Sequence, residues 1–283
     1  MKLSFGSWAF TRGPFEGNPV SFHATLHKLE DEGFQGIELG AVTPHPTPDS
    51  HPTREKRERV RREVADHGLA FSGISPNLRD QKLVSVDDCG PYLAAFIRYL
   101  MFADDLGIPA IRVDTVEPLI ELSGVDSKRI FERAVKTFGL CSKIAADRGI
   151  RVCWEFEPHL PLHSPDEIVA VVETVRSQGH ANFGVLFDTS HAHVCSAGRE
   201  IDLLSRLAGK INHVHLADSD GSCDERGVSR HLPLGAGRLD FAKLLPELRR
   251  ASDWWTVDLY NCPEAWDSLA LAKRFVDRFK SER

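Results

Sequence analysis

The chain alternates between short β-type runs and longer amphipathic stretches, and this alternation constrains its fold more than any other feature. The amphipathic stretches carry apolar residues every three to four positions, which is the spacing of one helix face. Several of them end on glycine, the residue that most readily adopts the left-handed conformation just past a helix. These glycines are Gly33, Gly68, Gly107 and Gly149. The runs expected to be strands are residues 3–9, 36–40, 70–75, 110–115, 151–157, 183–188, 211–217 and 254–260.

Eight strand-helix units are the number that closes a (β/α)8 barrel. A doubly wound sheet is the competing arrangement, but no GxGxxG motif follows the first run. A chain of 283 residues without a linker or repeat suits one such barrel. We therefore predict an α/β protein, a single-domain (β/α)8 TIM barrel spanning residues 1–283. Its longest loops, 41–53 and 219–237, have lengths that are typical of functional or mobile segments.

Composition and charge narrow the range of partners and compartments. Hydrophobic residues make up 42% of the chain and charged residues 27%, as in a globular protein with an ample core. The net charge of −6 provides no basic footprint, so we expect no nucleic-acid partner. Six cysteines without a CxxC pair indicate reduced thiols. There is neither a signal-peptide core nor a long apolar run, so we expect a cytoplasmic protein with no membrane partner.

Ionisable side chains gather at the ends of the last strands. Because side chains alternate along a strand, each expected strand has an apolar face and a face that carries acids or imidazoles. Charges deep inside a barrel are costly unless paired, whereas the carboxyl ends of the strands form the mouth where barrel active sites lie. Glu157, Asp188, His215 and Asp258 lie at or near these ends on four consecutive strands. We expect them to converge on one point.

Three carboxylates and one imidazole at one point require a counter-charge, and no lysine lies in these four runs. A divalent cation supplies that charge, and the oxygen-rich ligand set favours Mn²⁺ or Mg²⁺, with Co²⁺ and Zn²⁺ as other candidates. Simpler roles exist for single residues: Asp188 alone would suit a helix cap, and Glu155 would suit an ion pair with Arg112. Their joint occurrence on neighbouring strands favours a metal site with ligands Glu157, Asp188, His215 and Asp258.

The order and spacing of five motifs resemble the sugar phosphate isomerase/epimerase family, the xylose isomerase-like TIM barrels. The resemblance runs essentially end to end and rests on GIELG (36–40), WEFEP (154–158), LFDTSHAH (186–193), HVHLAD (213–218) and RHLPLGAGRLDF (230–241). It places the metal-binding glutamate, aspartate and histidine of the family on Glu157, Asp188 and His215. The fourth position, commonly glutamate, is Asp258. This side chain is shorter by about 1.5 Å, which is compatible with metal binding but weakens the case for proton transfer.

The resemblance implies a metal-dependent isomerase or epimerase that acts on a sugar, keto-sugar or polyol-derived ketone through an enediolate. Glu157 and Asp258 occupy the places of the catalytic carboxylates, and His159 at the mouth is a further candidate acid or base. His191 falls where relatives contact a substrate hydroxyl, and Arg230 and His231 match a loop pair that binds substrate or metal. Trp8 offers a flat wall for a sugar, or else a buried aromatic under a loop. Relatives are often homodimers or homotetramers.

Three other functions fit parts of the sequence. Abstraction of the same proton can end in β-elimination, as in a dehydratase or a lyase that cleaves 3-keto-glycosides. The α subunits of C-glycoside deglycosidases resemble such enzymes, and His159 together with the shorter Asp258 fits this chemistry. The loop 230–237 also echoes endonuclease IV, a phosphodiesterase, but the extra histidines and basic face of that enzyme are not visible. Last, the barrel could bind ligands without catalysis.

The sequence contains one short segment that resembles a phosphate-binding loop, GAG (235–237).

Overall fold

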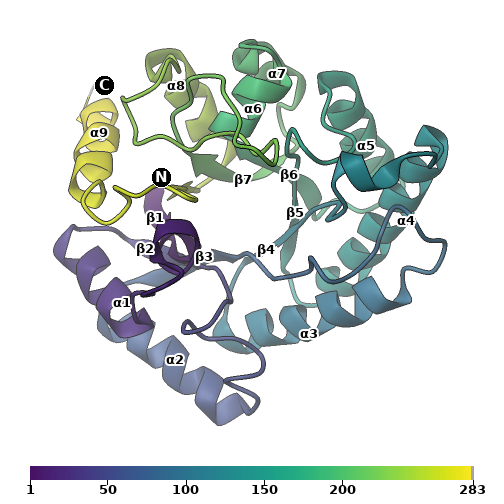
Figure 1. Ribbon diagram of the computed structural model, residues 1–283. Helices are drawn as coiled ribbons and strands as arrows, with labels where there is room; N and C mark the ends of the chain where they lie inside the picture. Colours follow the sequence, from purple (N-terminus) through teal and green to yellow (C-terminus); the bar gives the residue numbers. More distant parts are fainter. Residues whose placement is uncertain (282–283) are drawn as a thin grey trace.

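Eight parallel strands pair in sequence order around a closed ring, which confirms the predicted barrel. The computed structural model describes residues 1–281. Figure 1 views the barrel roughly along its axis, with the helices outside the strands. β1 pairs with β8 through Phe5 and Val257, and this pairing closes the barrel. The strands are β1 (Lys2–Gly6), β2 (Gly36–Leu39), β3 (Ala70–Ile74), β4 (Ala110–Val113), β5 (Arg151–Glu155), β6 (Phe183–Asp188), β7 (Ile211–Leu216) and β8 (Trp254–Val257).

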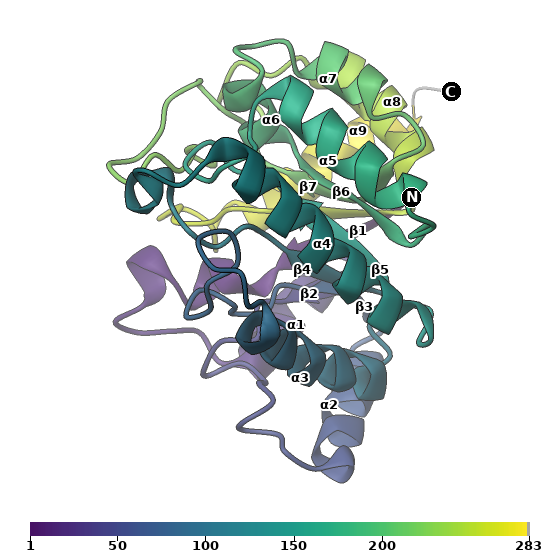
Figure 2. The same cartoon turned by 90° about the vertical axis from the view of Figure 1, so that its right-hand side faces the viewer.

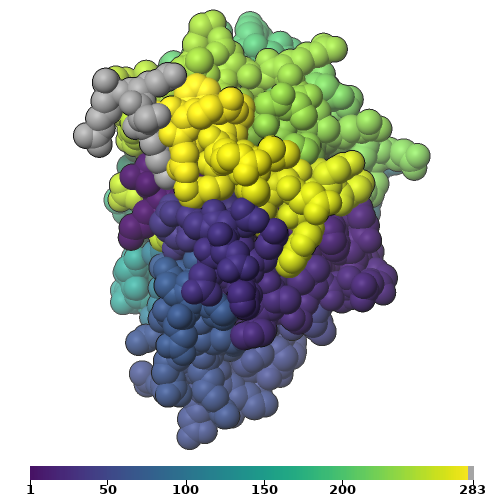
Figure 3. All heavy atoms as spheres, turned by 90° about the vertical axis from the view of Figure 1, so that its left-hand side faces the viewer, coloured from purple at the N-terminus to yellow at the C-terminus, as the bar shows by residue number. Residues whose placement is uncertain are grey.

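Helices surround the ring and cover its outer face. Figure 3 shows the C-terminal helix lying against the N-terminal segments, so the outer layer is closed as well. Three short 3-10 helices are η1 (Ser7–Phe10), η2 (Gly13–Phe15) and η3 (Leu119–Leu122). The α-helices are α1 (Phe22–Asp31), α2 (Arg54–Asp66), α3 (Gly90–Leu106), α4 (Ser127–Ala146), α5 (Pro165–Ser177), α6 (Thr189–Cys195), α7 (Glu200–Arg206), α8 (Phe241–Ala251) and α9 (Leu269–Ser281).

Local sequence explains where these elements begin and pack. Ser164 and Glu167 form a reciprocal capping box that starts α5, since each side chain bonds the other residue's backbone amide. Gly107 ends α3 with φ of 71°, a left-handed conformation that strains residues with a Cβ. Phe138 of α4 packs on Trp154 of β5 with ring centroids 5.7 Å apart. The apolar face of each strand is thus buried under helices, and the ionisable face is left for the barrel interior.

Seven strands end earlier than their sequence predicts, whereas β6 has the predicted bounds. β1 stops at Gly6, so Trp8 belongs to η1; β5 stops at Glu155 and β8 at Val257. A carboxylate side chain turns the backbone just past two of these ends: Val116 N donates to Asp114 at 2.7 Å, and Tyr260 N donates to Asp258 at 2.8 Å. Such local side-chain bonds compete with the ladder bonds of a sheet. Apolar composition therefore continues beyond the regular strand.

The carboxyl ends of the strands open on one side of the barrel. In Figure 2 the N-terminus lies on the right, and the long loops that follow the strands lie on the left. The loop 219–237 is anchored there by Asp218, which accepts backbone bonds from Gly235 at 2.9 Å and Leu239 at 3.1 Å. Among the described helices, none is both long and apolar enough to cross a membrane. The mouth of the barrel is therefore built by loops on a rigid ring.

Candidate metal centre

Four neighbouring strands each bring one side chain with a potential metal-ligand atom to the mouth of the barrel. Glu155 ends β5, Asp188 ends β6, His215 lies in β7 and Asp258 directly follows β8. One oxygen or nitrogen atom of each lies within 4.8 Å of the others. All four residues are at most 6% exposed. His215 Nδ1 lies 3.1 Å from Glu155 Oε1 and 3.3 Å from Asp258 Oδ2.

Two atoms of this group are buried without a hydrogen-bond partner in the described chain: His215 Nδ1 and Glu155 Oε1. Buried polar atoms in folded proteins almost always have a partner, so two such atoms facing each other indicate a missing third party. Two further carboxylates, Asp188 and Asp258, border the same point. Three carboxylates and one imidazole are a donor set that suits Mn²⁺, Mg²⁺ or a related divalent ion. The residues therefore fit a divalent cation.

The glutamate of this cluster is Glu155, which corrects the predicted ligand Glu157. Glu157 lies two residues further, beyond the end of β5, and the two side chains share one face of the chain. Alternation could not distinguish them, and the predicted strand ran two residues too far. Glu157 Oε1 instead accepts a hydrogen bond from Arg112 Nη2 at 2.6 Å. The structure thus brings Glu155, and not the predicted Glu157, together with Asp188, His215 and Asp258.

Arg112 of β4 supplies a positive charge that the sequence analysis did not place here. Its guanidinium donates to Asp114, Glu155 and Glu157. Burial alone would lower the pKa of Arg112, but the charges of these three carboxylates outweigh it and hold the pKa well above its ordinary value. The expected ion pair between Glu155 and Arg112 is therefore confirmed. It leaves Glu155 Oε1 facing His215, so the ion pair and the ligand role use different oxygens.

A buried carboxylate beneath the cluster orients its imidazole. Glu38 Oε2 accepts hydrogen bonds from His215 Nε2 at 3.0 Å, His213 Nε2 at 2.6 Å and Thr256 Oγ1 at 2.7 Å. Burial would raise the pKa of Glu38, but His215 and His213 hold it well below its ordinary value. With Nε2 bound to Glu38, His215 presents Nδ1 to the cluster, in the way that outer carboxylates orient metal-binding histidines.

Surrounding acids also favour a proton on His215. Burial would lower the pKa of His215, but Glu38, Asp258 and Glu155 raise it well above its ordinary value. A ligand imidazole must be neutral, so a cation competes with a proton for Nδ1. The same carboxylates that attract the proton attract the cation, which carries twice the charge.

Asp188 caps α6 and belongs to the cluster at the same time. Its Oδ1 accepts from the backbone N–H of His191 at 2.8 Å, and its Oδ2 lies 3.3 Å from His231 Nε2. Burial would lower the pKa of His231, but the charge of Asp188 and its acidic neighbours raises it to about 9. The rings of His191 and His231 lie 4.9 Å apart. Helix capping and ligation are therefore compatible roles for Asp188.

A pocket of about 100 Å³ lies over the cluster, and the predicted residues Trp8, His191 and His231 line it. Trp8 is buried, and its Nε1 donates to Asp258 Oδ1 at 2.8 Å. Its ring centroid lies 5.3 Å from that of His215. Trp8 thus combines the two expected roles, since it is a buried aromatic and a wall of the pocket.

The structure does not bring Arg230 and His159 into the lining of this pocket. The side chain of Arg230 is exposed and lines an adjoining cavity, while its backbone carbonyl accepts from Ser190 Oγ at 3.0 Å. His159 Nδ1 lies 3.4 Å from Glu157 Oε2, but the ring borders another cavity beside Leu119. Burial lowers the pKa of His159, which favours its neutral form. His159 lies just past β5, Arg230 lies in the long loop after β7, and the loop geometry turns both side chains away from this pocket.

Several pocket residues were missed by sequence reasoning. Asp114 at the end of β4 and Arg112 on the same face of that strand follow the alternation that located the ligands, so that signal existed. Arg12, Arg79 and Tyr260 lie in loops, where alternation carries no information. Only the closed barrel places these loops around one pocket.

Comparison with known proteins places this chain in a family. The model of the xylose isomerase-like TIM barrel family matches residues 26–275. The chain belongs to this family. Inosose dehydratase from Yersinia enterocolitica is 22% identical over 222 residues, which cover 75% of this chain and 68% of that enzyme. The uncharacterized protein MJ1311 of Methanocaldococcus jannaschii is 26% identical over 155 residues, covering 52% of this chain. The chain matches half of that relative's length.

Solved structures share the whole fold. The IolI protein with a bound zinc atom superposes with a TM-score of 0.79, and a D-tagatose 3-epimerase-like protein superposes with a TM-score of 0.77. Each match covers 100% of this chain and 99% of the other, at 18% sequence identity. The family includes enzymes, and at this identity the likeness to solved structures establishes the barrel architecture.

Proposed function

We propose that this protein is a divalent-metal-dependent enzyme that removes a proton next to the carbonyl of a small polyhydroxylated ketone. The substrate class is a sugar, a keto-sugar or a polyol-derived ketone. The observation that carries the proposal is the buried cluster of Glu155, Asp188, His215 and Asp258, with two unpartnered atoms facing its centre. When bound, a divalent cation polarises the carbonyl and stabilises the negative charge that forms on deprotonation.

Two cluster carboxylates have no oxygen left for a substrate proton. Asp258 Oδ1 accepts from Trp8 Nε1 and from the backbone N–H of Tyr260, and its Oδ2 faces His215. Glu155 Oε2 accepts from Arg112, and its Oε1 faces His215. Each therefore has one oxygen held by protein donors and the other at the cation site. Asp258 is thus proposed as a ligand and not as a proton-transferring base.

Glu157 is the carboxylate best placed to move the proton. Arg112 holds its Oε1, while its Oε2 lies 3.4 Å from His159 Nδ1 and 4.0 Å from His191 Nε2. Glu157 is 6% exposed and lines the pocket. A base must reach the proton that it abstracts, and Glu157 belongs to the pocket lining but not to the four-residue cluster, so its Oε2 is held neither by Arg112 nor at the cation site. The predicted catalytic role of Glu157 therefore remains, although its ligand role does not.

One base on one face favours proton transfer between adjacent carbons, which is isomerisation, over an epimerisation that uses bases on both faces. A sugar isomerase is therefore the first candidate. A dehydratase is the second, because a leaving hydroxyl needs a proton and the imidazole of His191, which lines the pocket, lies 4.0 Å from Glu157 Oε2. The similarity to inosose dehydratases supports this second outcome.

Proton exchange separates these outcomes. The protein, loaded with Mn²⁺ in D₂O, is incubated with a panel of ketoses and cyclic polyol ketones and followed by NMR. Deuterium incorporation with the carbonyl moved to the neighbouring carbon indicates isomerisation, deuterium at an inverted carbon indicates epimerisation, and loss of water indicates dehydration. E157Q is expected to abolish exchange while retaining the bound metal, whereas D188N is expected to lose the metal. Full exchange in E157Q, or a wild-type protein that binds no divalent ion, would refute the proposal.

The remaining expectations accompany this function as proposals. The substrate is a small carbohydrate-like molecule, and neither nucleic acid nor membrane is a partner. The enzyme is proposed to act in the cytoplasm with Mn²⁺ as its preferred ion. Assembly as a homodimer or homotetramer stays a prediction, to be measured by light scattering.

A further inference from the structure

Two arginines line the pocket on its solvent side. Arg12 follows η1, and Arg79 lies in the loop after β3. Both line the pocket above the cluster, and both also border an adjoining cavity of about 800 Å³ that shares Tyr260 and His231 with it. Arg12 is half-buried and Arg79 is exposed, whereas the cluster carboxylates are buried. The two arginines are therefore the more exposed part of a pocket whose cluster carboxylates are buried.

Neither guanidinium has a carboxylate within 4.0 Å or a hydrogen-bond acceptor in the described part of the chain. Two arginines that are half-buried like Arg12 do have such partners. Arg57 pairs with Asp105 at 2.7 Å, and Arg133 pairs with Asp87 at 2.5 Å. For the half-buried Arg12, partial withdrawal from water without an acceptor is unfavourable unless a ligand supplies one, whereas the exposed Arg79 keeps its donors hydrated until a ligand binds. The two arginines at the pocket thus have unused donors in a position that a substrate would occupy.

Charge distribution also separates two ends of the pocket. The deep end holds four carboxylates, those of Asp114, Glu155, Glu157 and Asp258, beside the guanidinium of Arg112 and the imidazoles of His215 and His231. An anionic group would be repelled there, although a divalent cation reduces this repulsion. The outer end carries two cations without acids paired to them, and planar guanidinium groups bind phosphate and carboxylate through two parallel hydrogen bonds.

We propose that the substrate carries an anionic group, a phosphate ester or a carboxylate, that Arg12 and Arg79 bind at the outer end of the pocket while its hydroxy-ketone end reaches the cluster. This inference rests on the proposed function for the position of the reacting end. The arginine site itself uses residues outside the metal cluster. Binding at the two ends can therefore be measured separately.

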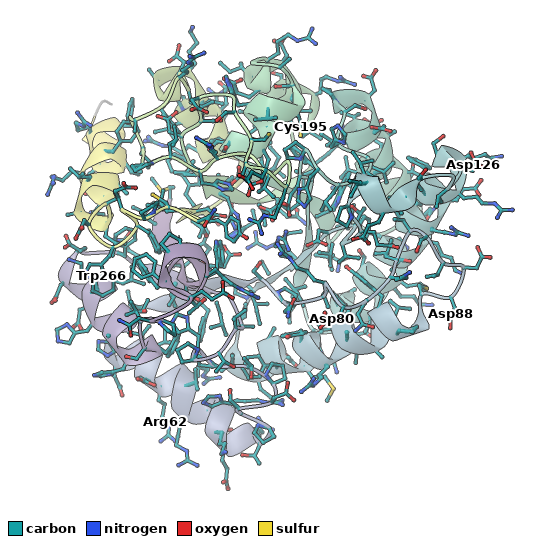
Figure 4. The ribbon with its side chains drawn as sticks, viewed as in Figure 1. Arg62, Asp80, Asp88, Asp126, Cys195 and Trp266 are labelled. Carbon is teal, nitrogen blue, oxygen red and sulfur yellow. The ribbon has the colours of Figure 1, made fainter. Side chains whose placement is uncertain are left out.

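The experiment compares three probes of similar size: neutral glucitol, glucitol 6-phosphate and gluconate. Their affinities for the Mn²⁺-loaded protein are measured by calorimetry with wild type, R12Q, R79Q and the double variant. The matched control is R62Q, which removes the same charge from the outer side of α2, far from the barrel mouth (Figure 4). The same titrations with D188N report binding without the cation, because asparagine retains the helix cap.

One of the anionic probes is expected to bind at least about tenfold more tightly than glucitol, and each arginine substitution is expected to cost about tenfold of that preference. R62Q retains the preference, and so does D188N. Which anionic probe is preferred identifies phosphate or carboxylate as the group. Equal affinity for neutral and anionic probes, or a preference that survives in the double variant, would overturn the inference. Persistence of the preference in a protein without proton exchange would refute the proposed function alone.

Discussion

Replacing Glu38 by glutamine tests the mechanism that orients the metal-binding imidazole. Three donors converge on one oxygen of Glu38: His215 Nε2 at 3.0 Å, His213 Nε2 at 2.6 Å and Thr256 Oγ1 at 2.7 Å. The amide of E38Q has similar size, but its oxygen is uncharged and its NH₂ group cannot accept. Outer-shell changes of this kind cost about 10–100-fold in metal affinity, which is roughly 1.4–2.8 kcal/mol.

We expect E38Q to bind Mn²⁺ about 10–100-fold more weakly than wild type in a competition titration with a chromophoric chelator. T256V is the matched control, because it removes one donor to Glu38 and leaves its charge and its bond to His215 in place. We expect T256V to change metal affinity less than about threefold, with a stability loss of about 1 kcal/mol. If E38Q binds Mn²⁺ as tightly as wild type, Glu38 does not control the imidazole. If both variants weaken binding equally, the effect is general destabilisation.

Three further predictions follow from single contacts. E155Q is expected to lower Mn²⁺ affinity at least about tenfold, whereas E157Q retains one equivalent, and elemental analysis of the purified variants would show the reverse if Glu157 were the ligand. W8F removes the donor to Asp258 and should weaken Mn²⁺ binding about three- to tenfold in the same titration; unchanged affinity would contradict that positioning role. Burial lowers the pKa of His45 from 6.5 to about 4, so unfolding takes up a proton between these pH values and stability falls as pH drops through them. This component, about 3 kcal/mol, should be missing from denaturant unfolding of H45N at pH 4.5 relative to pH 7.5; an identical pH dependence in both proteins would show that His45 does not titrate this way.

The fold was predictable because its two periodicities are strong. β-type runs with one apolar face and amphipathic stretches recur eight times. Tertiary packing agrees with these local strand and helix preferences and does not override them. Strand ends were less predictable, since residues such as Phe156 and Leu259 are as apolar as those in the strands and only the turn bonds of Asp114 and Asp258 reveal where the ladder stops.

That uncertainty explains the error at the metal cluster. An alternating pattern fixes the face of a residue but not its depth, so Glu155 and Glu157 were equivalent in sequence. Their depth depends on the stagger of β5 against its neighbours. Glu155 pairs with Leu186 of β6, which lies two residues before Asp188. Asp188 pairs directly with His215 across β6 and β7 and has no second carboxylate two residues away, whereas His215 has His213 two residues earlier on the same face of β7.

The shift from Glu157 to Glu155 also changes which residue can do chemistry. A ligand carboxylate whose second oxygen is already held by Arg112 or by Trp8 is well oriented but has little capacity to accept a proton. Glu157 sits one step outward, shares Arg112 with Glu155 and has an oxygen toward the pocket. Arg112 therefore fixes the ligand and the proposed base through one guanidinium. Because that group spans both residues, substituting Arg112 should disturb metal binding and proton transfer together, whereas E155Q and E157Q should separate them.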